Sequence, residues 1–155
     1  MSVFRVAKRF EVEYGHRLSK HLEKCRFPHG HRLSIEVVVR GERLDANDMV
    51  CDYKALKVLV TEIVNRLDHA MAFNSADPQA GKLADVGERI LLFQEQDPTT
   101  EVVARWLFEG IAAGLRPGRT VRSEGGVDYI LPDGLELERV RVWETSTSWA
   151  EYASS

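Results

Sequence analysis

The order of patterns along the chain predicts an α+β protein in which helices cover one face of an antiparallel sheet. Two segments with apolar residues at alternate positions come first, two segments with helical spacing follow, and strand-like segments close the chain. Strands grouped apart from helices are typical of this fold class. A length of 155 residues suits one core, so we expect residues 1–155 to form a single domain.

The composition resembles that of ordinary soluble globular proteins, with 44% hydrophobic and 29% charged residues. A net charge of -3 gives no support for binding to nucleic acid or to a membrane surface. Residues 1–10 are charged and no apolar run approaches the roughly 18 residues of a spanning helix, so we expect neither a secretory signal nor a membrane span. Two cysteines are too few for a disulfide framework and suit the reducing cytoplasm, which is the expected location.

The first predicted strand covers residues 4–16. Its apolar face would carry Phe4, Val6, Phe10, Val12, Tyr14 and His16, with charged residues between them. Such alternation predicts a half-buried strand, and it places His16 on the inward face. A lone inward histidine is more often a core residue bonded to a backbone carbonyl than a ligand, but two further histidines downstream reverse this preference.

Those two histidines begin the second predicted strand, residues 29–39, after a polar loop at residues 17–28 that contains an exposed His21. His29 and His31 fall on the apolar face because alternate side chains of a strand point the same way. Glycine, aspartate and asparagine in residues 41–48 predict a chain reversal.

The first predicted helix is capped by Asp52, and its apolar spacing continues to Leu67, so we expect it to end near residues 68–69. Residues 74–96 form a long connection. This connection contains Pro78, Gly81, Gly87 and a short apolar run at residues 90–93. Loops of this length are uncommon unless they cover something.

The second predicted helix begins with Asp97 or Thr99 as its cap and ends at Gly114 or Gly118. Its apolar stripe would consist of Val102, Val103, Trp106, Leu107 and Ile111. Residues 119–134 predict a strand, a turn and a return, which together would form a protruding hairpin. Residues 136–144 and 148–152 are the last predicted strands, with Glu144 on the inward face of the first.

His16, His29 and His31 have the makings of a three-histidine zinc site. Imidazole nitrogen suits Zn²⁺, and three protein ligands leave a fourth position for water or substrate. Cys25 then admits two interpretations: a fourth ligand that closes a structural site, or a nucleophile or base beside an open one. Asp68 and His69 favour the second, since a carboxylate and an imidazole could activate a thiol. A solvated helix end is the alternative for this pair.

Glu144 is an inward carboxylate, which is costly to bury without a partner. A planar ligand with an amidine-like edge would satisfy it, as would an ion pair with Arg141 or Arg105. Glu101 could simply complement the helix dipole, and Cys51 is expected to be a small buried side chain.

Together these motifs resemble the 6-pyruvoyl-tetrahydropterin synthase family, most closely its bacterial 6-carboxy-tetrahydropterin synthase branch of the queuosine pathway. The matching motifs are the strand ending at His16, Cys25-x-x-x-His29-Gly30-His31, Met49-Val50-Cys51-Asp52-Tyr53-x-x-Leu56-Lys57, Leu67-Asp68-His69, Pro98-Thr99-Thr100-Glu101 and Trp143-Glu144-Thr145. Three residues between the cysteine and the histidine pair is the spacing of the carboxy branch. The 74–96 connection and the 119–134 segment are longer than in compact members.

The resemblance implies a tunnelling fold, with a four-stranded antiparallel sheet and two helices packed on one face. It also implies homo-oligomers, trimers or hexamers, with active sites between subunits. Under it, His16, His29 and His31 bind zinc, Cys25 transfers a proton with Asp68 and His69 as its relay, and Glu144 anchors the pterin and can join the relay. Thr100 and Glu101 would lie near the pterin.

The implied activity is a zinc-dependent carbon-oxygen lyase acting on 7,8-dihydroneopterin triphosphate, with 6-carboxy-5,6,7,8-tetrahydropterin, acetaldehyde and triphosphate as products. One rival is formation of the 6-pyruvoyl product by triphosphate elimination alone. The other is a non-catalytic domain in which Cys25 and the three histidines close around a structural zinc.

Overall fold

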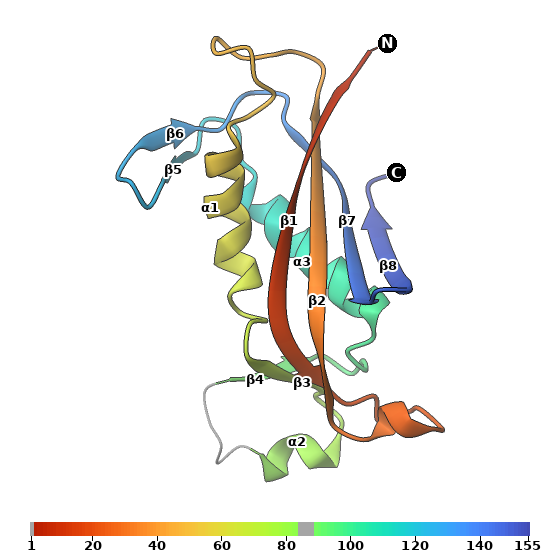
Figure 1. Ribbon diagram of the computed structural model, residues 1–155. Coiled ribbons are helices and arrows are strands. Elements are labelled where there is room, and N and C mark those ends of the chain that lie inside the picture. Colours follow the sequence, from red (N-terminus) through yellow and green to blue (C-terminus); the bar gives the residue numbers. More distant parts are fainter. Residues whose placement is uncertain (1, 84–88) are drawn as a thin grey trace.

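Two long strands form the centre of the sheet. In this computed structural model, which describes residues 2–83 and 89–155, β1 (Phe4–His16) pairs antiparallel with β2 (His29–Gly41) along its full length (Figure 1). The strand β7 (Glu136–Thr145) pairs with β2, and β8 (Ser148–Ala153) pairs with β7, both antiparallel. These four strands confirm the expected antiparallel arrangement.

Two short strands extend the sheet, so the expectation of four strands in all was wrong. The strand β3 (Ala70–Asn74) pairs parallel with the end of β1, and β4 (Ile90–Phe93) pairs parallel with β3. The six-stranded order is β4-β3-β1-β2-β7-β8. Four of the five residues of β3 are buried, which removes the alternation that reveals a strand.

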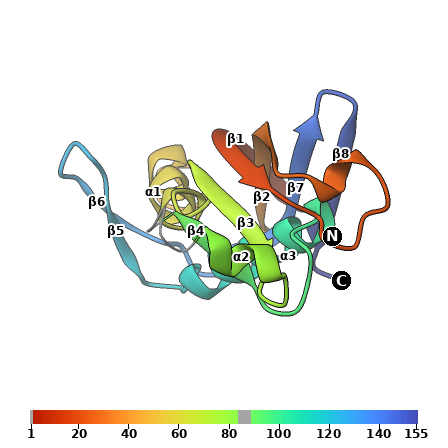
Figure 2. The same cartoon turned by 90° about the horizontal axis from the view of Figure 1, so that it is seen from below.

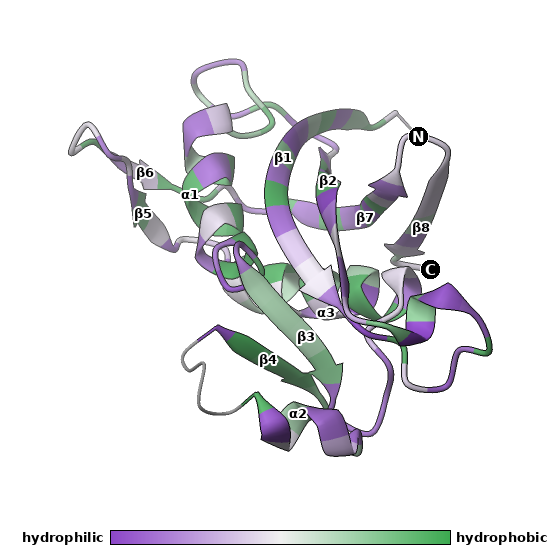
Figure 3. Cartoon of the chain, turned by 60° about the horizontal axis from the view of Figure 1, so that its bottom comes forward, coloured by the Kyte–Doolittle hydropathy of each residue, from purple (hydrophilic) through white to green (hydrophobic). Residues whose placement is uncertain are grey.

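The 74–96 connection therefore holds structure of its own. It contains β4 and a short helix, α2 (Pro78–Lys82), whose cap Asp77 accepts a hydrogen bond from the backbone of Gln79. Gly87, expected to interrupt regular structure here, lies outside the described residues. Figure 3 shows the continuous hydrophobic colouring of β4 beside the alternating colours of β1.

Two longer helices cover one face of the sheet, as predicted (Figure 2). The helix α1 (Tyr53–Val64) is capped by the Asp52 side chain and ends before the expected residues 68–69. The helix α3 (Thr100–Gly114) is capped by Thr99 rather than by Asp97. The core between helices and sheet includes Val12, Ile35, Val37, Leu56, Leu59, Leu107, Ile111, Val140 and Val142.

The segment between α3 and β7 forms the expected hairpin. Its strands β5 (Thr120–Arg122) and β6 (Asp128–Ile130) make a separate two-stranded sheet that projects beyond α1 (Figure 1). A single 3-10 turn, η1 (Lys24–Arg26), interrupts the loop between β1 and β2. None of the described helices combines the length and apolarity needed to cross a bilayer.

Candidate metal centre

The three histidines converge at one end of the helix-covered face. His16 closes β1, and His29 and His31 open β2, with His16 directly opposite His29 in the strand register. One ring nitrogen of each lies within 4.8 Å of the others. The strand pairing thus places on one face the three imidazoles that the alternation predicted would share it.

Backbone carbonyls fix the orientation of two of these rings. His16 Nδ1 lies 2.8 Å from the carbonyl oxygen of Pro98, and His29 Nδ1 lies 2.6 Å from that of Phe27. A carbonyl only accepts hydrogen bonds, so each Nδ1 is the donor and each neutral ring has its lone pair on Nε2. This is how histidine ligands are usually oriented in metal sites.

The Nε2 atoms of His16 and His29 then face each other without a proton between them. His16 Nε2 and His29 Nε2 lie 2.9 Å apart. His31 Nε2 is the one buried side-chain nitrogen or oxygen, among residues 2–83 and 89–155, that lacks a hydrogen-bond partner. Lone pairs repel at this separation, and buried polar atoms are rarely left unsatisfied. A cation bound by the three nitrogens satisfies all of them, so the donor set fits a metal ion such as Zn²⁺.

Burial favours the neutral form of two of these imidazoles, His16 and His31. It lowers the pKa of His16, against the opposing effects of the Pro98 carbonyl and the Glu144 charge. Burial likewise lowers the pKa of His31. Metal ligation requires the neutral ring, so both shifts favour it. Burial and the nearby Glu144 charge raise the pKa of Tyr14, whose hydroxyl lies 3.5 Å from the Pro98 carbonyl and stays protonated.

Glu144 points into the cluster from β7. Its Oε1 lies 3.3 Å from His16 Nε2 and 3.5 Å from His31 Nε2. The alternative of an arginine partner is wrong, because Arg141 pairs with Glu151 and Arg105 bonds Gln96. Among the described residues, Glu144 thus has ion-pairing distances to these two histidines and to no arginine or lysine.

Thr100 and Glu144 line a narrow gap beside His16, between the start of α3 and the sheet, that is too small to admit a water molecule. Tyr14, Leu33, Pro98, Val103 and Val142 complete its lining. Glu101 lies in the first turn of α3, is exposed, and is not among these residues. The structure therefore brings Thr100, but not Glu101, to the gap beside the cluster.

Cys25 is a free, half-buried thiol in η1. Its backbone carbonyl accepts a hydrogen bond from Leu18, and Phe27, two residues later, bonds the His29 ring. The thiol does not belong to the candidate metal cluster found among the described residues. That argues against a closed site of one cysteine and three histidines.

Asp68 and His69 form a pair on the other side of β1. His69 Nδ1 lies 3.1 Å from Asp68 Oδ2, while Asp68 Oδ1 accepts a hydrogen bond from the backbone of Glu13. Burial opposes ionisation, but this backbone bond and His69 hold the pKa of Asp68 below its usual value. The His69 ring is exposed and lines an open hollow of about 510 Å³ with His29 and His31. No hydrogen bond or ion pair joins this pair to Cys25 in the part of the chain that the structure describes.

Sequence reasoning missed Asp97, which anchors the Cys25 loop. Its buried carboxylate accepts hydrogen bonds from the Ser19 hydroxyl at 2.5 Å, the Lys20 backbone at 2.8 Å and the Asn74 amide at 3.2 Å. Burial opposes ionisation, yet these bonds hold the pKa of Asp97 below its usual value. In the sequence Asp97 precedes a proline, which suggested only a helix cap. Its other role could not be predicted, since its partners come from segments distant in sequence.

Known proteins resemble this chain over most of its length. The family described as 6-pyruvoyl tetrahydropterin synthase matches residues 5–155. A protein of Aquifex aeolicus named 6-carboxy-5,6,7,8-tetrahydropterin synthase is 29% identical over 96% of this chain and 97% of its own length. A Haemophilus influenzae protein of the same name is 24% identical over 97% and 99%.

Solved structures share the fold. An uncharacterised protein of Wolinella succinogenes superposes with a TM-score of 0.79 at 20% identity, covering 100% of both chains. The Caenorhabditis elegans 6-pyruvoyl tetrahydropterin synthase superposes with a TM-score of 0.67 at 20% identity, covering 100% of this chain and 98% of its own.

Proposed function

The chain belongs to the 6-pyruvoyl tetrahydropterin synthase family, and on this premise we propose that it is a zinc-dependent pterin lyase. The predictions of an enzyme and of a tunnelling fold are confirmed by the family match and by relatives named as synthases. The proposed reaction converts 7,8-dihydroneopterin triphosphate and water to 6-carboxy-5,6,7,8-tetrahydropterin, acetaldehyde and triphosphate. The queuosine pathway, the cytoplasmic location and the single-domain organisation belong to the same proposal.

The zinc site is supported by the three converging imidazoles, in which His16 Nε2 faces His29 Nε2 and His31 Nε2 has no hydrogen-bond partner. When bound there, zinc would act as a Lewis acid on the oxygens of the substrate side chain. The Nδ1 atoms of His16 and His29 are held by the Pro98 and Phe27 carbonyls, so these two rings are positioned before the ion arrives.

Cys25 is the proposed base, and its loop is well fixed for such a role. Arg17 bonds the Arg26 carbonyl and the buried carboxylate of Asp77, while Asp97 binds the loop from the other side. A thiolate so placed could remove a proton from the substrate side chain. Thr100 and Glu144 are proposed to contact the pterin, and Glu101 to lie at the edge of its binding site.

Asp68 and His69 are proposed to relay protons for a Cys25 of a neighbouring subunit. The outer edges of β1, from residues 4 to 13, and of β8 have no strand partner among the described residues. Two complementary open edges favour head-to-tail pairing, which closes into a ring. A trimer or hexamer with active sites between subunits would unite Cys25 with an exposed His69.

Product identification tests this proposal. Zinc-loaded protein is incubated with 7,8-dihydroneopterin triphosphate, and we expect acetaldehyde and the 6-carboxy product. Accumulation of the 6-pyruvoyl compound without acetaldehyde would instead establish the pyruvoyl activity, and an unchanged substrate would reject both.

Two variants test the proton relay. We expect Cys25→Ala to retain zinc and lose turnover, and His69→Ala to do the same. If the relay crosses subunits, oligomers assembled from a mixture of the two variants regain turnover. If mixed oligomers form but stay inactive, either the relay lies within one subunit or these residues do not form a relay.

A further inference from the structure

We propose that Asp77 is a positioning residue for Cys25 and acts through Arg17; this rests on the proposed function, in which Cys25 is the base. Asp77 caps α2 within the 74–96 connection. Both α2 and the loop that carries Cys25 lie at the same end of the sheet (Figure 1). The long connection between β3 and α3 would thus support the proposed active site by holding this loop.

Arg17 joins Asp77 to the backbone beside Cys25. It directly follows His16, the last residue of β1, and its Nε donates a hydrogen bond to Asp77 Oδ2 at 2.6 Å. Its Nη1 donates to the carbonyl oxygen of Arg26, one residue after the thiol, at 2.8 Å. The donors of a guanidinium have a fixed planar geometry. The position of the carboxylate therefore determines where the Arg26 carbonyl is held.

The Asp77 carboxylate is itself fixed. Its side chain is 0% exposed, and its Oδ1 accepts a hydrogen bond from the Gln79 backbone at 2.9 Å. Its backbone nitrogen donates to the carbonyl of Asn74, the last residue of β3, at 3.0 Å. A buried carboxylate cannot move without losing these bonds, and a buried group left without partners is costly. Strand β3 and helix α2 thus hold the acceptor to which Arg17 is bound.

The short helical turn η1, which contains Cys25, has few other ties to the rest of the protein. The Leu18 backbone donates to the Cys25 carbonyl at 3.0 Å. Among the described residues, Arg17 is the one side chain from outside the 18–27 loop that bonds the backbone of η1. Loss of its carboxylate partner should therefore loosen the turn that carries the thiol.

The variant Asp77→Asn removes the charge and keeps the helix cap, because asparagine caps a helix about as well as aspartate. Arg17 then loses its anionic partner. In zinc-loaded protein we expect kcat to fall roughly 10- to 100-fold with little change in KM, since a small displacement of a reacting group costs this much. Zinc content should stay that of the wild type, because the pairing of β1 with β2 places the three histidines.

Alkylation of Cys25 by iodoacetamide reports the position of the loop without any substrate. The other thiol, Cys51, is 4% exposed, and burial raises its pKa to about 11, so it should react slowly. Mass spectrometry of the digested protein distinguishes the two sites. We expect Asp77→Asn to raise the alkylation rate at Cys25 several-fold while the circular dichroism spectrum stays that of the wild type.

The variant Glu62→Gln is the matched control. Glu62 also pairs with an arginine, Arg119, at 2.9 Å, and this arginine likewise donates to a backbone carbonyl, that of Gly114 at 2.9 Å. Here the arginine joins α1 to the end of α3 instead of reaching the Cys25 loop. We expect Glu62→Gln to have the kcat and the alkylation rate of the wild type.

An unchanged alkylation rate at Cys25 in folded Asp77→Asn overturns the proposal, whatever happens to kcat. A raised rate with the kcat of the wild type overturns it too, because the position of the loop would then not matter for turnover. If Asp77→Asn fails to fold, Arg17→Lys takes its place, since one ammonium cannot reproduce the two bonds of the guanidinium fork. A wild type without turnover contradicts the proposed function, and the alkylation rates still decide whether Asp77 positions the loop.

Discussion

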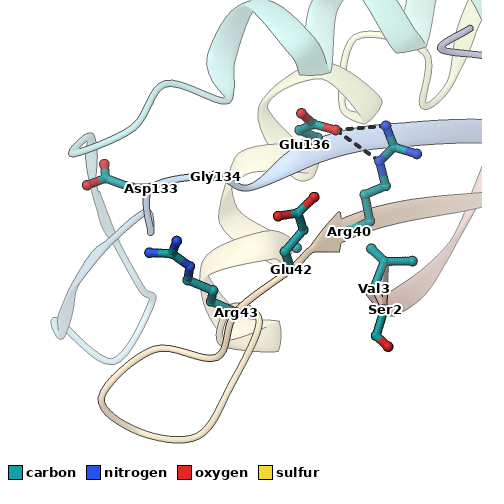
Figure 4. Close-up of a pocket in the computed structure, with 9 residues that line it drawn as sticks. Ser2, Val3, Arg40, Glu42, Arg43, Asp133, Gly134 and Glu136 are labelled. Carbon is teal, nitrogen blue, oxygen red and sulfur yellow. Dashed lines mark hydrogen bonds and ion pairs between the residues drawn. The ribbon is translucent and has the colours of Figure 1, made fainter.

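The two ends of β2 differ in a way that identifies the functional one. His29 and His31 begin the strand, and Arg40 lies near its end beside a hollow of about 590 Å³ (Figure 4). That hollow is far larger than the space beside Glu144, which is too narrow to admit a water molecule. By size alone the Arg40 end would be chosen as the binding site.

At the Arg40 end, the arginine has carboxylate partners. Arg40 pairs with Glu136 at 2.9 Å and lies 3.8 Å from Glu138, as the meeting side chains in Figure 4 show for the first pair. At the histidine end, acceptors face acceptors and His31 Nε2 has no donor. Converging atoms without partners are therefore a better sign of a ligand site than the volume of a hollow.

Removing one histidine should have the largest effect. We expect His31→Ala to lose zinc and to reduce turnover roughly 1,000-fold or more, because a Lewis acid contributes several kcal/mol. Zinc content by mass spectrometry and initial rates measure this. The exposed His21 provides the control, and His21→Ala should retain zinc. Full zinc occupancy in His31→Ala would show that the histidine end of β2 does not bind the metal as argued.

Asp97→Ala tests the anchoring of the Cys25 loop at the same end. Three donors lose a buried carboxylate, so we expect the free energy of unfolding to fall by about 2–4 kcal/mol. The native pKa of Asp97 is depressed, so its contribution is full above the unfolded value of about 3.9 and disappears as pH falls through the native pKa. Urea titrations at several pH values show whether the two proteins converge in acid.

The exposed pair of Asp128 with Arg122 is the matched control for that variant. Asp128→Ala should change the free energy of unfolding by less than about 0.5 kcal/mol. Equal losses in Asp97→Ala and Asp128→Ala would mean that burial of the carboxylate is unimportant.

Metal removal should destabilise the protein through the histidine end alone. At zinc concentrations of 100 times the dissociation constant, binding adds about 2.7 kcal/mol. For a chain of this size that raises Tm by roughly 5–11 °C. Burial lowers the pKa of His16 and His31, so this gain should persist at pH 6.5 and disappear only in more acidic buffer. Calorimetry with zinc and with chelator measures it, and identical Tm values would contradict a metal site.

Arg40→Ala should have the smallest effect. Exposed ion pairs contribute at most about 1 kcal/mol, so we expect little change in stability and none in zinc affinity. Denaturant midpoints and zinc titrations test this. A loss of zinc or of turnover in this variant would show that the larger hollow matters after all.

The sequence by itself determined the elements whose residues repeat with a clear period. Alternation placed His16, His29 and His31 on inward faces, and helical spacing located α1 and α3. Turn residues marked the β5–β6 hairpin. These features could be predicted because each depends on residues close together in the chain, where the backbone period decides which side chains share a face.

The tertiary structure alone decided the rest. β3 was missed because a short run buried on both faces loses its period, and β4 because its four residues are all apolar and do not alternate with polar ones. The partners of His16, Asp97 and Glu144 lie far away in sequence, and only the packing of α3 and β7 against β1 and β2 brings them together. Periodicity fixes which way a side chain points. What it meets there depends on the strand register and on the approach of distant segments, which no local pattern encodes.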